Sequence, residues 1–136
     1  MVQIDISYDG GLHCTAKHLP SGTTLATDAP VDNQGKGESF SPTDLVATAL
    51  GTCIATTMDI YARRKDIDLT GLKITVQKEM TTSAPRRIAK LTTEIWIPLP
   101  LSADPERHLE RVALGCPVHA SLAESVDLPV EFHYAE

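Results

Sequence analysis

The feature that most constrains this chain is one long stretch at residues 40–65, FSPTDLVATALGTCIATTMDIYARRK. Its beginning carries several signals of a helix start. Ser41 can cap the first free backbone amides, and Pro42 suits the first helical position. Asp44 completes an S-x-x-D capping box and also complements the positive end of the helix dipole. The pattern therefore predicts a long helix over residues 41–65.

The interior of this predicted helix is apolar or small almost all the way round, and it carries no charge between Leu45 and Asp59. A helix without a broad polar face is typical of a buried position rather than of a surface. We therefore expect a central helix that is buried on most sides. Since a chain of 136 residues offers few elements to cover it, we also expect the helix to pack partly against a second copy of the protein.

Alternating apolar and polar residues predict strands on both sides of the central helix. The predicted order is βββ-α-ββ-αα-β, which keeps strands and helices segregated and favours the α+β class with antiparallel sheets. The length fits a single domain over residues 1–136. Its predicted parts are an N-terminal β-meander at 1–27, a loop at 28–40, the central helix at 41–65, a β-hairpin at 72–98, helices at 104–124 and a last strand at 129–135.

Composition excludes some classes of function. Twelve Lys and Arg stand against eighteen Asp and Glu, giving a formal net charge of −6, whereas nucleic-acid binding usually needs a basic face. We expect no membrane span, because no segment reaches the ~18 apolar residues that a span requires. The first residues do not resemble a signal peptide. We therefore expect a soluble, cytoplasmic protein that binds neither nucleic acid nor membranes.

The chain has three cysteines, Cys14, Cys53 and Cys116. An odd number in a reducing compartment suggests catalysis, metal binding or redox chemistry rather than a structural disulfide framework. Cys116 precedes Pro117 at the start of a predicted helix, where free amides and the helix dipole lower the pKa of a thiol. Cys53 lies inside the central helix and gains little from the dipole. On the residues alone, Cys116 is the better-activated thiol, although either cysteine could be inert.

Other chemistries fit the sequence less well. A metal site could combine Cys116, His119 and Cys53 with His13 or Cys14, but C-x-x-H is only half of a structural zinc pattern and the second half is missing. A serine hydrolase is disfavoured because there is no G-x-S-x-G motif. We therefore expect no bound metal and no cofactor.

Two cysteine contexts together carry a family resemblance. The motif S-P-T-D-L at residues 41–45 is followed by Cys53 eight positions after its leucine, and G-C-P-V-H places Cys116 at a helix start 63 residues later. Across its whole length the chain resembles the OsmC/Ohr family of thiol-dependent peroxide reductases, in the S-P-x-[DE]-L branch. The resemblance implies an OsmC-like fold and an intertwined homodimer built around two central helices.

The same resemblance implies the chemistry of the site. Cys53 matches the peroxidatic cysteine, which attacks a small-molecule peroxide, and Cys116 matches the resolving cysteine, which forms a disulfide with it. An external dithiol, either thioredoxin-like or lipoyl, then reduces that disulfide. The apolar surroundings of Cys53 favour organic hydroperoxides.

The sequence departs from the family pattern at the groups that activate the first thiol. Thr43 stands where a glutamate is expected, Asp44 lies one place later, and no arginine occurs before Arg63. Lys36 is the nearest substitute for the family arginine, but a lysine lacks the fork that holds a carboxylate by two hydrogen bonds. We therefore take Asp44, Thr43 and Lys36 as candidate auxiliary residues and expect weak activity. The alternative is a binding protein for a small apolar ligand at the dimer interface, with non-catalytic cysteines.

Overall fold

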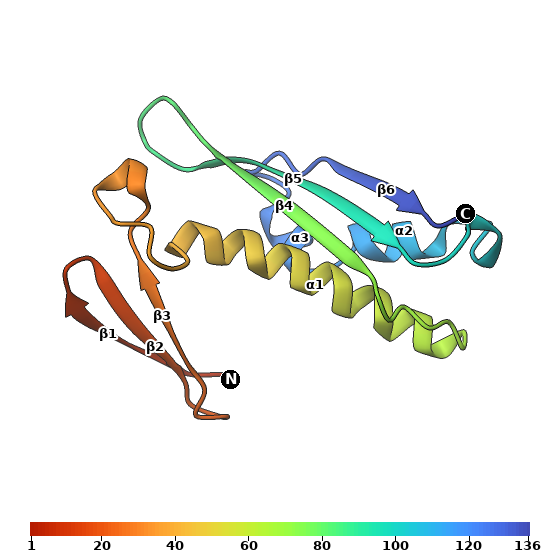
Figure 1. Ribbon diagram of the computed structural model, residues 1–136, viewed down its shortest axis with the longest axis horizontal. Helices are drawn as coiled ribbons and strands as arrows, with labels where there is room; N and C mark the ends of the chain where they lie inside the picture. Colours follow the sequence, from red (N-terminus) through yellow and green to blue (C-terminus); the bar gives the residue numbers. More distant parts are fainter. The chain divides into compact units, whose positions relative to one another are not determined.

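The computed structural model describes all of residues 1–136, and its helices and strands follow in the predicted order (Figure 1). The class is α+β, as predicted. The elements are β1 (Ile4–Gly10), β2 (His13–His18), β3 (Thr24–Asp28), the 3-10 helix η1 (Val31–Asn33), α1 (Pro42–Arg64), β4 (Lys73–Met80), β5 (Ile88–Ile97), the 3-10 helix η2 (Leu101–Ala103), α2 (His108–Leu114), α3 (Pro117–Leu122) and β6 (Val130–Tyr134).

The chain forms two compact units, Met1–Val46 and Ala47–Glu136. The first contains the sheet β1-β2-β3 and the loop before α1, and the second contains the sheet β4-β5-β6 with most of the helical residues. That residues 1–136 make up a single domain stays a prediction.

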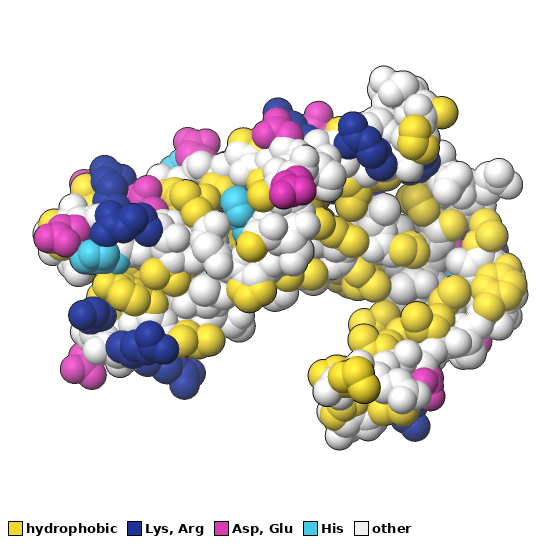
Figure 2. All heavy atoms as spheres, turned by 180° about the vertical axis from the view of Figure 1, so that it is seen from behind, with side chains coloured by type: hydrophobic (Ala, Val, Ile, Leu, Met, Phe, Trp, Pro, Cys, Tyr) yellow, Lys and Arg dark blue, Asp and Glu magenta, His cyan; other side chains and the backbone are white.

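In the first unit, both strand pairs are antiparallel, and the register sorts side chains onto two faces of the sheet. Ile6 lies opposite Ala16, which in turn lies opposite Leu25. Because side chains on directly paired residues share a face, one face is apolar. Its larger members are all exposed: Ile4, Ile6, Tyr8 and Leu25. In Figure 2, hydrophobic side chains gather over these N-terminal strands.

The loop between β3 and α1 is held by its own backbone. Asp28 donates its amide hydrogen to the carbonyl of Phe40 at 3.1 Å, and Gly35 donates to the carbonyl of Pro30 at 2.9 Å. A Cβ atom at Gly35 would lie 1.7 Å from the carbonyl oxygen of Ala29. The loop predicted at 28–40 therefore folds back tightly on itself, and only glycine fits at position 35.

The predicted start of the central helix is confirmed. α1 begins at Pro42, the Asp44 amide donates to Ser41 Oγ at 3.1 Å, and the Ser41 amide donates to Asp44 Oδ2 at 2.9 Å. This reciprocal pair is a capping box, which satisfies two backbone amides that no helical carbonyl can reach.

In the second unit, helices cover one face of the sheet (Figure 1). The inward side chains of β5 are buried and alternate along the strand, as predicted: Leu91, Thr93, Ile95 and Ile97. α1 comes close to β4 because residue 51 is a glycine, where an added Cβ would lie 3.2 Å from Val76 Cγ2. Sheet, α1 and α2 thus share one hydrophobic core.

This second sheet is mixed rather than wholly antiparallel, which corrects the sequence expectation. β4 pairs antiparallel with β5, but β6 pairs parallel with β5. The physical reason lies in the connection, since α2 and α3 form a crossover between β5 and β6. Such a crossover returns the chain to run in the same direction, whereas a tight hairpin would reverse it.

The burial of α1 also differs from the prediction. Its buried side chains lie at helical spacing along one stripe, at Ala47, Leu50, Ile54, Met58 and Ala62, while Ile60 is exposed. Within a single chain, α1 is therefore buried on one face rather than on most sides. By length and composition alone the helix could also cross a membrane, which differs from the expectation that the segment is too short.

Candidate functional site: a pair of thiols

Cys53 lies in the middle of α1 and is half-buried. Its sulfur is 3.9 Å from the hydroxyl oxygen of Thr57, one helical turn further on. Positions four apart share a helix face, so the helix itself sets this contact. A hydroxyl at this place can donate a hydrogen bond to the sulfur. Thr57 was missed in the sequence analysis, although the i, i+4 spacing could have indicated it.

Cys116 occupies the N-cap of α3, as predicted, and it is fully buried. Pro117 is the first residue of the helix, and the sulfur of Cys116 accepts a hydrogen bond from the backbone amide of His119 at 3.3 Å. The preceding helix, α2, ends at Leu114, so Cys116 lies in the short connection between α2 and α3.

The two sulfurs come together although 62 residues separate them in the chain. The side chain of Cys53 acts on that of Cys116 both by hydrogen bonding and by charge. Burial raises the pKa of the Cys116 thiol, and the neighbouring Cys53 raises it further, while the amide hydrogen bond from His119 lowers it. Both cysteines are free thiols in this structure.

Cys116 is therefore not activated in the predicted way, because the expectation that the helix start lowers the pKa of its thiol is wrong. The cap geometry is present, but the net pKa of this thiol is raised, with burial as the largest cause. An apolar environment disfavours the thiolate more than one amide and a short helix can favour it. At neutral pH, Cys116 is a protonated thiol held beside Cys53.

The candidate auxiliary residues serve other purposes in this structure. Asp44 completes the helix cap, and the hydroxyl of Thr43 lies 3.2 Å from that of Ser41. Lys36 is exposed, and it is its backbone amide that contributes to lowering the pKa of Asp28. An activating role for any of the three stays a prediction.

The alternative metal site does not form from the predicted residues. His119 turns its backbone amide toward Cys116, and the groups of side chains close enough to share an ion contain no cysteine. One of these groups includes His13, together with residues that the sequence analysis did not single out.

Comparison with known proteins assigns this chain to a family. Residues 35–131 match the model of the family described as OsmC-like protein. The chain belongs to the OsmC-like family. This membership makes α1 the core helix of the fold rather than a membrane span. A comparison with curated protein sequences finds no match.

Several solved structures share the fold of this OsmC-like chain. A candidate osmotic stress induced and detoxification response protein of Psychrobacter arcticus 273-4 is 40% identical, with a TM-score of 0.90 over 98% of this chain and 96% of that one. An organic hydroperoxide resistance protein OsmC of Legionella pneumophila is 16% identical, with a TM-score of 0.77 over 98% and 96% of the two chains.

A third solved structure carries a bound molecule. This candidate organic hydroperoxide resistance protein of Vibrio cholerae holds captopril in one of its active sites. It is 18% identical, with a TM-score of 0.75 over 96% of this chain and 90% of that one. At this identity the likeness concerns the fold alone. The OsmC-like fold thus includes organic hydroperoxide resistance proteins among its solved members.

Proposed function

We propose that this protein reduces organic hydroperoxides with Cys53 as the peroxidatic and Cys116 as the resolving cysteine. The observation that supports this most directly is the interaction of the two thiols. Cys53, in the middle of α1, is half-buried, and Cys116, at the start of α3, is fully buried. Membership of the OsmC-like family supports the same chemistry.

The reaction balances in three steps. The Cys53 thiolate attacks the distal oxygen of the hydroperoxide, which breaks the O–O bond, leaves a sulfenic acid on Cys53 and releases an alcohol after protonation. The Cys116 thiol then attacks the Cys53 sulfur and expels water, giving a disulfide. An external dithiol of thioredoxin-like or lipoyl type reduces this disulfide by exchange and is itself oxidised.

The environments of the two cysteines support this division of roles. The peroxide must reach the attacking sulfur, and Cys53 is the more accessible of the pair. Cys116 is shielded and stays protonated at neutral pH, because burial raises its pKa. It therefore does not compete for the peroxide, and it transfers its proton as the disulfide forms.

The activating group differs from the family pattern, and this sets the expected rate. No arginine occurs before Arg63, and beside Cys116 the structure offers Cys53 the Thr57 hydroxyl at 3.9 Å. A neutral hydroxyl stabilises a thiolate less than a cation does. We therefore expect a slow peroxidase.

We also propose that the protein is active as a homodimer and is located in the cytoplasm. The exposed apolar face of β1–β3 and the exposed Ile60 on α1 supply surfaces that a second copy would cover. Exposed apolar surface of this extent commonly marks an interface.

The decisive experiment is a thiol count before and after one equivalent of cumene hydroperoxide, followed by peptide mapping. The expected result is the loss of two thiols per chain and a Cys53–Cys116 disulfide. Cys53→Ser should abolish the reaction. The matched control is Cys14→Ser, which removes the half-buried cysteine of β2 and should leave the result unchanged. Survival of all three thiols, or an active Cys53→Ser variant, overturns the assignment.

A second candidate function is binding of a small apolar ligand. The second unit has an open hollow of about 480 Å³ beside α1, and its apolar lining includes Ile60, Leu69 and Leu72. Neither Cys53 nor Cys116 lines this hollow. Native mass spectrometry of freshly purified protein distinguishes the two functions, since a retained small molecule supports binding and a loss of two hydrogens under mild peroxide supports the thiol pair.

A further inference from the structure

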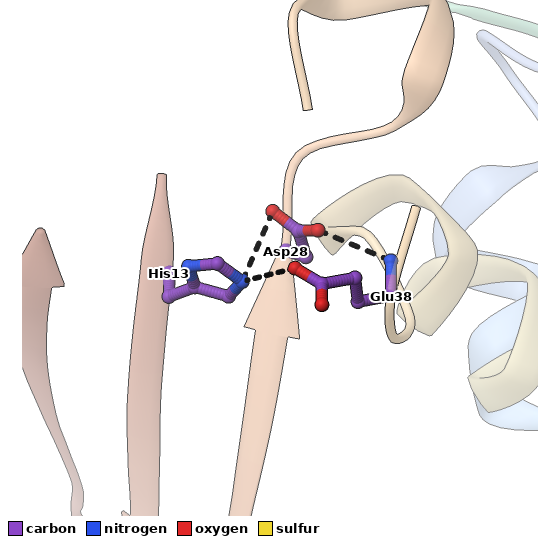
Figure 3. Close-up of side chains that lie close together, drawn as sticks. All are labelled: His13, Asp28 and Glu38. Atoms are coloured by element: carbon purple, nitrogen blue, oxygen red, sulfur yellow. Dashed lines mark hydrogen bonds and ion pairs between the residues drawn. The ribbon is translucent and has the colours of Figure 1, made fainter. Parts of the chain in front are cut away.

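A separate group of chemistry-bearing side chains lies in the N-terminal unit, on the polar face of the sheet opposite to its apolar side chains. It consists of His13 on β2, Asp28 at the end of β3 and Glu38 in the loop before α1 (Figure 3). One atom of each side chain lies within 4.8 Å of the other two. The proposed peroxidase mechanism uses none of the three. We call them the His13–Asp28–Glu38 cluster.

We propose that the His13–Asp28–Glu38 cluster binds a divalent first-row metal ion of the Zn²⁺ type, with water completing the coordination. The ion would cross-link β2, β3 and the loop at 29–40 and so stabilise this part of the fold. We call this cross-link the clip.

The strongest observation is the state of Asp28. Its side chain is only 1% exposed, and Oδ1 has no hydrogen-bond partner although it is fully shielded. This oxygen points toward His13 and the Glu38 carboxylate (Figure 3). A buried polar oxygen without a hydrogen bond is rare in folded proteins, because its desolvation is costly, and the ion pair of Oδ1 with His13 is long at 3.5 Å. A bound cation beside Oδ1 would remove that cost.

The distances suit metal ligands better than direct hydrogen bonds. His13 Nε2 lies 3.5 Å from Asp28 Oδ1 and 3.5 Å from Glu38 Oε1. Charged hydrogen bonds between nitrogen and oxygen are typically about 2.7–2.9 Å long. In a tetrahedral zinc site with bonds of ~2.0–2.1 Å, neighbouring ligand atoms are about 3.4 Å apart. Both distances from His13 Nε2 therefore match the spacing of neighbouring ligands around an ion.

The backbone holds each member of the cluster in place. The strand register sets His13 directly opposite Asp28. The other carboxylate oxygen of Asp28 accepts a hydrogen bond from the Glu38 amide at 3.1 Å, and this bond is the largest cause that lowers the pKa of Asp28. The Asp28 amide in turn binds the carbonyl of Phe40. Asp28 is therefore ionised and oriented before any ion arrives, as a metal ligand requires.

The ligand set limits the kind of ion. One imidazole and two carboxylates suit Zn²⁺, Mn²⁺ or Fe²⁺, whereas Mg²⁺ prefers oxygen ligands throughout. Glu38 is 58% exposed, so water can reach the open positions. Three protein ligands and water make a coordination set known for zinc.

The chain contains a matched control in its second unit. Glu94, Glu131 and His133 form a group of similar composition on β5 and β6, with His133 Nε2 at 3.1 Å from Glu94 Oε2. That distance is an ordinary hydrogen bond. All three side chains are at least 36% exposed, and the group has no buried oxygen without a partner. We expect no tight metal binding there.

The test measures metal binding by the full-length protein after removal of metals with a chelator. Zn²⁺ titration by calorimetry gives stoichiometry, and Mn²⁺ titration followed by electron paramagnetic resonance reports a site that thiols do not provide, since Mn²⁺ prefers oxygen and imidazole ligands. We expect one ion per chain. Glu38→Gln alters an exposed side chain and should fold normally, yet it should weaken binding at least about tenfold. Asp28→Asn should weaken it further.

The control variant His133→Gln should bind both ions as the unaltered protein does. Equal binding by the unaltered protein, Glu38→Gln and Asp28→Asn overturns the proposal, as does a loss of binding in His133→Gln. Because Mn²⁺ prefers oxygen and imidazole ligands to thiols, the Mn²⁺ result is independent of the peroxidase assignment.

Tryptic cleavage supplies a second readout of the clip. Lys36 is exposed within the loop that the ion would fix, and Arg87 lies in the link between β4 and β5, far along the chain. Zn²⁺ should slow cleavage after Lys36 at least about tenfold, because cleavage requires the loop to open, while cleavage after Arg87 should not change. Equal rates at Lys36 with and without Zn²⁺ contradict the clip.

Discussion

The two sheets of this protein have the same number of strands and similar alternation of apolar residues, but their apolar faces differ in burial. In the C-terminal sheet, Ile95 is 0% exposed. In the N-terminal sheet, Ile6 is 69% exposed. Alternation therefore indicates which face of a strand is apolar, but it does not indicate whether the same chain covers that face.

This difference has a functional consequence. The thiol pair belongs to the unit with the covered sheet, where burial raises the pKa of Cys116. The N-terminal sheet has an exposed apolar face, which the proposed dimer would cover, and its opposite face carries the His13–Asp28–Glu38 cluster. In the unit with the covered sheet, burial changes the pKa of a thiol. The uncovered sheet instead offers an apolar surface to a second protein chain.

The largest effect is expected from Ile95→Ala in the covered sheet. Removing this buried side chain leaves a cavity, and the free energy of unfolding should fall by about 2–5 kcal/mol in urea denaturation. Ile6→Ala, measured in dilute protein where any dimer has dissociated, should change it by less than ~0.5 kcal/mol. Equal losses for the two variants would show that the N-terminal face is covered within its own chain.

A charge on the uncovered face should break the proposed dimer. Ile6→Asp places a carboxylate within the apolar face of β1, and we expect it to weaken self-association at least about tenfold in analytical ultracentrifugation, because the charge would be desolvated in the interface. The matched control is Thr24→Asp, an exposed position on the opposite face of the same sheet. A dimer that survives Ile6→Asp unchanged contradicts this interface.

A smaller effect is expected from Thr93→Val, inside the covered sheet. The hydroxyl of Thr93 is buried and has no hydrogen-bond partner, so replacing it with a methyl group of similar size removes a desolvation cost. The free energy of unfolding should rise by about 1 kcal/mol. Both variants are compared by thermal denaturation, where Thr92→Val, on the other face of β5, should have a smaller effect. A loss of stability in Thr93→Val would mean that the hydroxyl has a polar partner.

Much of the fold follows from local sequence signals. Ser41, Pro42 and Asp44 identify the start of the central helix, because capping involves residues that are neighbours in sequence. Alternation identifies the strands, and Pro117 identifies the helix that Cys116 caps. The parallel pairing of β6 did not follow, since the direction of a crossover depends on where two helices pack and not on any residue of the strand.

The candidate site divides in the same way. The sequence by itself determined the α+β element order, the family motifs around Cys53 and Cys116, and the cap that Cys116 provides. Only the tertiary structure decided that burial raises the pKa of Cys116, that α1 buries a single face within one chain, and that Asp28 meets His13 and Glu38. Caps and alternation depend on residues close in sequence, whereas burial, strand register and ligand geometry depend on segments that meet only after folding.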